Sequence, residues 1–389
     1  MARLIDITGK AVSGEWGTDD ETGDGIPVLR TTNFTNDGFV NFADVVTRTI
    51  IKKNIKEKFL RTGDIIIEKS GGSDKQPVGR VIYYDGPPDT YLFNNFTGLL
   101  RIRDQSKWFP RYVFYSLFAN YHRGGTRAFE NKTTGLHNLK TDDYVSCFEV
   151  ADAKYPLQVE ICNNLDGIAG ILSLRQQELQ KLDNLIKARF VEMFGDPVSN
   201  PLGLPIKKLS DLGTLDRGRS QHRPRNAPEL LGGPYPLIQT GEVAAADLYI
   251  TEYHNTYSEK GLEQSKMWKA GTLCITIAAN IAQTAIMTFD ACFPDSVVGF
   301  VPYDDVNAHY MHFWFGFFQK ILEEQAPQVA QKNINLKILS DLNVIVPPRE
   351  ELKAFEQYVA QINKTKSVIQ KSLDETQLLF DSMMQQYFG

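Results

Sequence analysis

The chain has 389 residues, of which 42% are hydrophobic and 23% are charged, with 29 glycines and 18 prolines. This composition predicts a folded protein of two or three domains and excludes collagen, a wholly disordered chain and a continuous coiled coil. The net charge of −5 argues against a protein that binds polyanions over its whole surface.

The four cysteines, Cys147, Cys162, Cys274 and Cys292, lie far apart without a CxxC pair. We therefore expect neither a disulfide framework nor a cysteine zinc site, and a reducing, cytoplasmic location. The N-terminal residues lack the apolar run of a signal peptide, and the most apolar window, from Leu273 to Met287, is interrupted by Asn280 and Gln283. We expect no membrane segment.

Taken in chain order, the sequence predicts four parts. Residues 1–153 contain short β-rich runs separated by Gly, Pro, Asn and Asp, which is typical of an α+β domain, and residues 198–347 have the same texture. Residues 154–197 and 348–389 each predict one long helix that begins after a proline, and the first of these helices ends at Gly195 and Pro197.

The second half of the chain repeats the first. The segment Gly25 to Phe34 is echoed by Pro234 to Val243, Phe59 to Ser70 by Met267 to Ala278, Gly135 to Tyr144 by Asn333 to Leu342, and Arg189 to Gly195 by Met383 to Gly389. The order of the segments is kept while the loop lengths differ. A diverged tandem duplication explains this pattern better than chance.

Apolar residues in the two long helices recur with alternating spacings of three and four, which is typical of a coiled coil. We therefore predict two equal helices that pack antiparallel with pseudo-twofold symmetry, although two separate helices that each cover their own domain are the alternative. The predicted packing positions are Ile161, Leu165, Ile168, Leu172, Leu179, Leu182, Ile186, Leu352, Phe355, Val359, Ile362, Ile369, Leu373 and Phe380.

The sequence contains no phosphate-binding P-loop, dinucleotide-binding glycine motif, GxSxG elbow, HExxH helix or [DNS]PP[YFW] aminomethyltransferase motif. His309 and His312 form a close pair, but they lie in an aromatic run that predicts a buried helix rather than a metal site. Asp64, Glu68 and Lys69 are a poor nuclease candidate, because Glu68 and Lys69 are adjacent and would point to opposite faces of a strand. We predict no catalytic residue and no metal.

Positive charge is clustered despite the acidic average, in Arg48 to Arg61 and in Asp216 to Arg225, and polar Gly-rich loops occur in both halves. Such residues suit contacts with DNA phosphates and base edges, although a solvated surface is an equally good interpretation of each segment alone. The candidate DNA-binding residues are Lys52, Lys53, Lys56, Lys69, Ser70, Ser73, Lys75, Gln76, Arg80, Arg127, Lys132, Arg217, Arg219, Gln221, Arg223, Arg225, Asn280, Gln283, Gln331 and Lys332.

The order of these blocks resembles the specificity (S) subunit of type I restriction-modification enzymes over the whole chain. The most specific match is LIKARFVEMFGDP from Leu185 to Pro197, supported by IPVLRTTNF, LRTGDIIIEKSGG with PVGRV, and GLHNLK. The resemblance implies two target recognition domains, at 1–153 and 198–347, joined by conserved spacer helices. The region around Ala278 to Ala285 departs from it in being poorer in Lys and Arg.

The resemblance also implies a function without catalysis by this chain. Each recognition domain would read one half of a bipartite, asymmetric duplex DNA site. Two modification (methyltransferase) subunits would carry S-adenosylmethionine, and restriction subunits, with ATP and Mg, would join through them. The alternatives are a coiled-coil adaptor whose α+β domains bind proteins, which the acidic charge favours slightly, and a DNA-modifying enzyme of an unfamiliar type.

Overall fold

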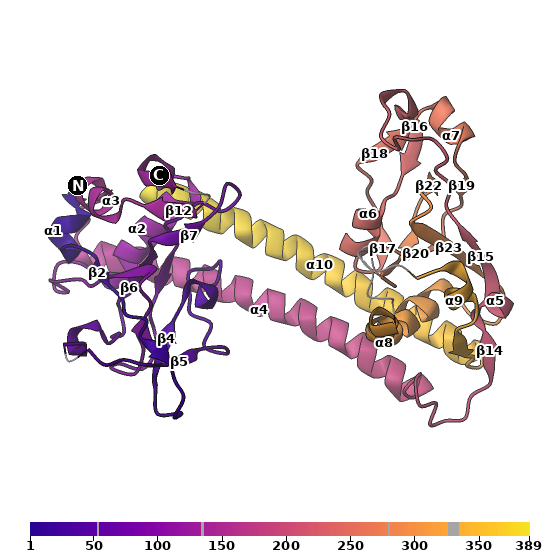
Figure 1. Ribbon diagram of the computed structural model, residues 1–389, viewed down its shortest axis with the longest axis horizontal. Coiled ribbons are helices and arrows are strands. Elements are labelled where there is room, and N and C mark those ends of the chain that lie inside the picture. The colour runs from indigo at the N-terminus through magenta and orange to yellow at the C-terminus, as the bar shows by residue number, and fades with distance from the viewer. Residues whose placement is uncertain (53, 134–135, 279–280, 326–333) are drawn as a thin grey trace. The chain divides into compact units, whose positions relative to one another are not determined.

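The computed structural model describes residues 1–52, 54–133, 136–278, 281–325 and 334–389 (Figure 1). The chain divides into two compact units. Unit 1 comprises residues 1–175 and 372–389, and unit 2 comprises residues 176–371. Each unit contains one domain of mixed helices and strands together with parts of the two long helices, α4 (Tyr155–Phe194) and α10 (Arg349–Phe388). The fold class is therefore α+β, as predicted.

Unit 1 begins with strand β1 and continues through short strands and three helices to α4. Its elements before α4 are β1 (Ala2–Arg3), α1 (Leu4–Thr8), β2 (Val12–Ser13), β3 (Thr18–Asp19), β4 (Ile26–Leu29), η1 (Thr31–Asn33), β5 (Val46–Thr49), η2 (Lys56–Lys58), β6 (Ile65–Glu68), β7 (Ser70–Gly72), β8 (Val81–Tyr83), β9 (Leu92–Phe93), β10 (Thr97–Leu100), α2 (Pro110–His122), η3 (Arg127–Phe129), β11 (Glu130–Thr133), β12 (Leu136–Leu139), α3 (Thr141–Cys147) and β13 (Glu149–Val150).

The centre of unit 1 is a four-stranded sheet with the order β2-β10-β6-β8. All four residues of β6 are buried, which explains why this strand reads as a continuous apolar run instead of an alternating one. One side of the sheet packs with α2 in a core that includes Ile65, Ile67 and Val113. Further sheets have the orders β3-β5-β4-β9, β11-β12-β7 and β1-β13.

Unit 2 repeats this plan between α4 and α10. Its elements are β14 (Ile206–Lys208), α5 (Leu209–Leu212), β15 (Gly213–Arg217), η4 (Pro228–Leu230), β16 (Leu231–Leu237), α6 (Thr240–Ala245), β17 (Tyr249–Ile250), β18 (Asn255–Tyr257), α7 (Glu259–Glu263), β19 (Met267–Trp268), β20 (Leu273–Thr276), β21 (Thr284–Met287), β22 (Ala291–Cys292), β23 (Val297–Pro302), α8 (Ala308–Gln325), α9 (Leu336–Ser340) and β24 (Asn343–Ile345).

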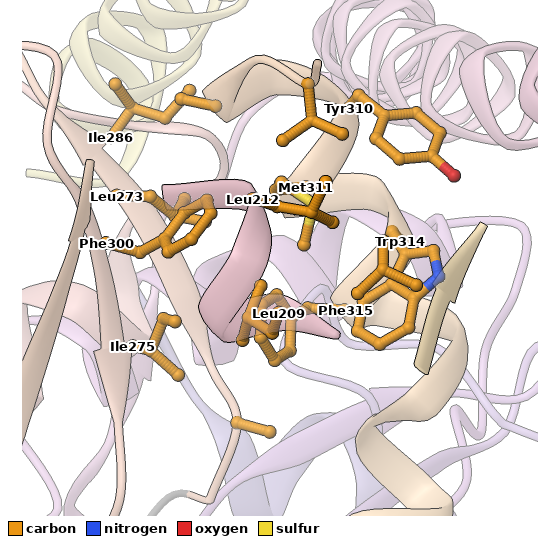
Figure 2. Close-up of a cluster of buried hydrophobic side chains, with 14 of the residues drawn as sticks. Leu209, Leu212, Leu273, Ile275, Ile286, Phe300, Tyr310, Met311, Trp314 and Phe315 are labelled. Atoms are coloured by element: carbon orange, nitrogen blue, oxygen red, sulfur yellow. The ribbon is translucent and has the colours of Figure 1, made fainter. Parts of the chain in front are cut away.

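The central sheet of unit 2 has the order β15-β23-β20-β21-β17, and a second sheet has the order β18-β16-β22-β19. Figure 2 shows the core beside the central sheet, where Leu273, Ile275 and Phe300 of the sheet face Met311 and Trp314 of α8. Burial of these large apolar side chains is the main favourable term that holds the unit together.

The duplication predicted from the sequence is present in the topology. The sheet β2-β10-β6-β8 corresponds to β15-β23-β20-β21, and the edge pair β1-β13 corresponds to β14-β24. Two short turns are also capped alike, because Asn33 Oδ1 accepts from the Arg30 N–H at 2.9 Å and Glu242 Oε2 accepts from the Gln239 N–H at 3.1 Å. These residues lie in the first pair of repeated segments, so the match extends to individual hydrogen bonds.

The long helices run in opposite directions where they meet in each unit. In unit 1, Ile161 and Leu165 of α4 share a core with Met384 and Phe388 of α10. In unit 2, Ile186 and other residues near the end of α4 share a core with residues near the start of α10. Of the predicted packing positions, six are buried, namely Ile161, Leu165, Ile186, Leu352, Phe355 and Val359, and the other eight are half-buried.

Polar residues interrupt the apolar spacing of both helices, and some of them meet across the pair. The Arg175 guanidinium of α4 donates to the Ser372 carbonyl and to Thr376 Oγ1 of α10. In unit 2, Lys366 of α10 forms ion pairs with Asp183 of α4 and with Asp247. A buried or half-buried polar group needs such a partner, so these contacts favour one register of the two helices.

Candidate nucleic-acid interface

All four strands of the central sheet in unit 1 have one end on the same side of the sheet. Ser13 pairs with Gly98, Gly98 with Ile67, and Ile67 with Val81, so these residues form one row across the four strands. With neighbouring strands about 4.8 Å apart, the row is about 14 Å wide. We call residues 14–17, 69–80 and 94–96, which leave the sheet beyond this row, the loop end of unit 1.

Unit 2 has the same row. Arg217 pairs with Val298, Val298 with Ile275, and Ile275 with Thr284. The loop end of unit 2 consists of residues 218–227, 277–283 and 293–296, of which 279 and 280 lie outside the described residues. The glycine-rich segment of the first half and the arginine tract of the second half have different sequences. They nevertheless leave corresponding ends of the two sheets.

Several candidate residues of unit 1 meet at a small sheet beside this end. Strand β7 pairs with β12, which pairs with β11, so Ser70 lies opposite Asn138 and the Lys132 strand lies beyond it. Lys132 forms an ion pair with Asp74 at 2.5 Å, and the Gln76 N–H donates to Ser73 Oγ at 3.1 Å. The exposed members of this group are Ser73, Lys75, Gln76, Arg127 and Lys132.

Lysines of the first basic cluster converge on a carboxylate. Lys52 Nζ lies 2.8 Å and Lys58 Nζ 2.6 Å from Glu15 Oε1, and hydrogen bonds from both ammonium groups lower the pKa of Glu15. Lys69 Nζ donates to Ser13 Oγ at 2.8 Å, and burial lowers the pKa of this lysine. Lys69 therefore belongs to the loop end of unit 1, and Lys52 and Lys58 contact it through Glu15. Lys56 is exposed in the adjacent η2 turn.

Arg80 has a partner within the protein. Its Nε and Nη2 atoms donate to the two carboxylate oxygens of Glu68, each at 3.1 Å, and the Glu68 side chain is 2% exposed. Asp64, the other carboxylate weighed as a nuclease ligand, is held by Arg101 at 2.6 Å. The Glu68–Arg80 pair anchors the connection that contains Ser70 to Gln76, so Arg80 acts first as a support of the loop end.

The candidates of unit 2 are arranged differently. Five of them are exposed: Arg217 is the last residue of β15, and the connection after it contains Arg219, Gln221, Arg223 and Arg225. Gln283 is instead half-buried and lines a cavity of about 470 Å³ together with His312, Asn363 and Lys366. Three further candidates, Asn280, Gln331 and Lys332, lie outside the described residues, as does Lys53 of unit 1.

Sequence reasoning missed the partners that order these cations. The candidate DNA-binding residues include neither Glu15 nor Lys58. They also lack Lys266, which pairs with Asp216 at 2.9 Å and lies over the Trp268 ring at 3.9 Å. Glu15 stands 37 and 43 residues from its two lysines. No local pattern reports such a pairing, because the sheet register alone brings the segments together.

The part of the chain that the structure describes holds no group of three or more His, Cys, Asp or Glu side chains that could bind a metal ion. His309 lies 3.3 Å from Glu356 and its Nε2 lies 2.6 Å from the Tyr249 hydroxyl. Among the described helices, none is long and apolar enough to cross a membrane.

Comparison with known proteins gives a family match for part of the chain and fold matches for all of it. Residues 201–377 match the model of the type I restriction modification DNA specificity domain. The solved S subunit of a type I restriction-modification system from M. genitalium is 14% identical, with a TM-score of 0.59, over 100% of this chain and 95% of that one.

A second solved chain comes from work on complex assembly and conformational transition of the type I R-M system. It is 15% identical to this chain, with a TM-score of 0.55, and the match covers 100% of this chain and 96% of the other. At this level of identity the two solved structures establish the fold. Residues 201–377 are thus similar to the type I restriction modification DNA specificity domain, and the whole chain has the fold of the two solved structures.

Proposed function

We propose that this specificity subunit reads a bipartite, asymmetric DNA site, with unit 1 reading one half and unit 2 the other. The observation that carries the proposal is the loop end, which is built twice on corresponding sheet rows but presents different side chains. Unit 1 presents lysines, serines and a glutamine, whereas unit 2 presents four arginines and a glutamine. Two copies of one frame with different polar surfaces suit the reading of two different half-sites.

The charges at the loop ends favour DNA over a protein partner. Lys and Arg side chains bind phosphates regardless of sequence, whereas Gln and Arg donate to the edges of bases in the major groove. The match of residues 201–377 to a DNA specificity domain likewise does not favour the adaptor hypothesis. Because net charge is −5, we expect weak binding by the chain alone and specific binding in complex with its partners.

The subunit would act without catalysis of its own. Two modification subunits would supply S-adenosylmethionine and the methyl transfer, and restriction subunits would supply ATP- and Mg-dependent chemistry. In unit 1 the carboxylates of Asp64 and Glu68 are each held by an arginine, which favours a structural role over metal binding. The complex would work in the cytoplasm, where the DNA is.

The test is to express the chain with its modification subunit in a methylation-deficient host and to map the methylated bases. We expect one motif with two specified halves, separated by a fixed number of unspecified base pairs and methylated on both strands. A matched control omits this chain. Methylation by the modification subunit alone, or methylation of a continuous motif, would contradict the proposal, and methyl transfer by the purified chain alone would contradict a non-catalytic role.

A further inference from the structure

Three arginines, Arg217 at the end of β15 and Arg223 and Arg225 at the loop end of unit 2, converge on Asp295 in the turn between β22 and β23. Arg217 donates through Nε and Nη2 to the Asp295 carbonyl oxygen at 3.0 and 2.7 Å. Arg225 Nη2 donates to carboxylate Oδ1 at 2.6 Å, and Arg223 Nη2 lies 3.6 Å from Oδ2. The backbone and the side chain of Asp295 thus both hold guanidinium groups.

The segment that carries the arginines is also fixed from its other side. Gln264 Oε1 accepts hydrogen bonds from the N–H groups of Gln221 at 2.7 Å and His222 at 3.0 Å. Ser265 Oγ donates to the Arg219 carbonyl at 3.0 Å, and Ser220 is buried between these contacts. The backbone of the segment is therefore preformed, and Asp295 sets the direction of the side chains that project from it.

Stability of the fold does not account for this arrangement. The side chains of Arg223 and Arg225 are 56% and 46% exposed, and that of Asp295 is 34% exposed. Ion pairs with this exposure contribute about 0–1 kcal/mol to folding. In addition, Arg223 and Arg225 share one carboxylate and Arg217 is held by the carbonyl oxygen of the same residue, so positive charge exceeds negative charge in this cluster. Such an excess on rigid guanidinium groups suits an oxyanion of the phosphate type.

We propose that Asp295 is a positioning residue for DNA recognition, which holds Arg217, Arg223 and Arg225 as one preformed phosphate-binding cluster. This inference rests on the proposed function and deepens it. Ordering the long side chains before binding lowers the entropy that the complex loses on association. The carboxylate meanwhile repels DNA that does not fit, so its effect is on discrimination more than on raw affinity.

Unit 1 shows the same principle with other residues. There the carboxylate of Glu15, at the corresponding loop end, accepts hydrogen bonds from Lys52 and Lys58. In each unit, therefore, an acid at the DNA-reading end is surrounded by more than one cation. An acid placed at random on a DNA-binding surface would be expected only to weaken binding.

The experiment replaces Asp295 by Asn, which keeps the shape and removes the charge. The chain in complex with its modification subunits is titrated with its cognate duplex and with a duplex of unrelated sequence at fixed salt. Simple electrostatics predicts that both affinities rise equally. If Asp295 positions the arginines, binding to unrelated DNA rises while cognate binding does not, and the ratio of the two affinities falls about five- to tenfold.

The matched control is Glu252→Gln, which removes an exposed acid of the same unit and should leave the ratio unchanged. Arg225→Gln supplies a second measurement on an exposed residue, and in that background Asp295→Asn should change the ratio less than it does alone. An unchanged ratio for Asp295→Asn, or full additivity of the two substitutions, would overturn the inference. A wild-type complex that does not distinguish the two duplexes would instead refute the proposed function.

Discussion

The Glu68–Arg80 pair determines how the loop end of unit 1 is held. Glu68 is almost fully buried, and both of its carboxylate oxygens accept from Arg80. Removing one partner of a buried pair leaves an uncompensated charge, so Arg80→Ala should lower the free energy of unfolding by about 3 kcal/mol. Thermal or urea unfolding measures this change.

The matched control for Arg80 is Arg127→Ala, which removes an exposed arginine from the same unit. It should change stability by less than about 0.5 kcal/mol. If Arg80→Ala proved as stable as Arg127→Ala and reduced only DNA binding, Arg80 would be a direct DNA contact instead of a support.

His312 should make unit 2 sensitive to acid. Burial lowers the pKa of His312 from 6.5 to about 4, and its Nδ1 lies 3.0 Å from Thr284 Oγ1. Because the unfolded chain takes up the proton first as pH falls, this contribution to stability is complete above pH 6.5 and is lost towards pH 4. Between these two pH values, the free energy of unfolding should fall by up to about 1.4 kcal/mol for each unit by which the pH falls.

The control variant is His312→Phe. His312 is the fifth residue of α8, and the fifth residue of α2 in unit 1 is Phe114, so the first half of the chain has a phenylalanine at this helix position. Burial also lowers the pKa of His309, which both proteins retain. The wild type should therefore lose more stability than the variant between pH 6.5 and pH 4. Parallel stability curves for the two proteins would rule out His312 as the source.

Base reading and phosphate binding should separate at two neighbouring residues of unit 1. Gln76 and Lys75 are both exposed in the turn after β7. Gln76→Ala should cost about 1–3 kcal/mol and relax the methylated motif at one position, whereas Lys75→Ala should weaken binding to all sequences and reduce the salt dependence. Motif mapping and salt titration of both variants check this. Motif changes in the lysine variant alone would reverse the two roles.

At the scale of elements, the backbone of each loop end passes very close to a neighbouring segment at one glycine. A Cβ atom on Gly218 would lie 2.2 Å from the Phe293 carbonyl oxygen, and one on Gly14 would lie 2.1 Å from that of Phe93. Gly218→Ala must therefore shift backbone, and we expect a loss of about 1–3 kcal/mol of stability. DNA affinity should fall with it, because the arginine segment begins at this glycine.

Gly241→Ala is the control for this position, because the residue is in helix α6 and, apart from its chain neighbours and the nearby backbone of that helix, no described atom lies within 4 Å of its added Cβ. It should leave stability unchanged or raise it. Calorimetry of both variants measures the difference. Equal melting temperatures for Gly218→Ala and Gly241→Ala would show that the strand can move away at no cost.

Elements with a strong local pattern were predictable. The spacing of Ile161, Leu165 and Ile168 and the flanking prolines mark α4, and corresponding residues mark α10. The order β2-β10-β6-β8 was not predictable, because strands of two to four residues carry little periodicity and their pairing depends on distant segments. The same limit hid the pairing of Lys58 with Glu15.

At the scale of the whole chain, the internal repeat was the most informative feature. Repeated segments predicted two related α+β domains and two equal helices, and the structure has two such units and two helices of 40 residues each. The repeat predicted that the loop after Ser70 corresponds to the loop after Ala278, but it did not predict the counterpart of the arginine tract. The arginine tract around Arg223 follows β15 and therefore corresponds to residues after β2, not to the lysine cluster around Lys52. Loop lengths differ between the copies, so only the sheet register reveals this correspondence.

Both long helices pass from one unit into the other, α4 between Arg175 and Gln176 and α10 between Lys371 and Ser372. We expect them to set the gap between the two half-sites. Inserting four residues into each helix at these points adds about 6 Å at about 1.5 Å per residue and nearly preserves the apolar face. Since base pairs are about 3.4 Å apart, the gap in the methylated motif should grow by one or two base pairs.

The half-site sequences should stay the same in this variant, because the insertion leaves the contacts within each unit in place. The matched control replaces four residues at the same points with four alanines, which keeps the helix length and should keep the gap. Methylated motifs of both variants are mapped in a methylation-deficient host. A fixed gap in the insertion variant, or altered half-sites, would mean that α4 and α10 do not measure the distance between half-sites. The helices would then serve another purpose.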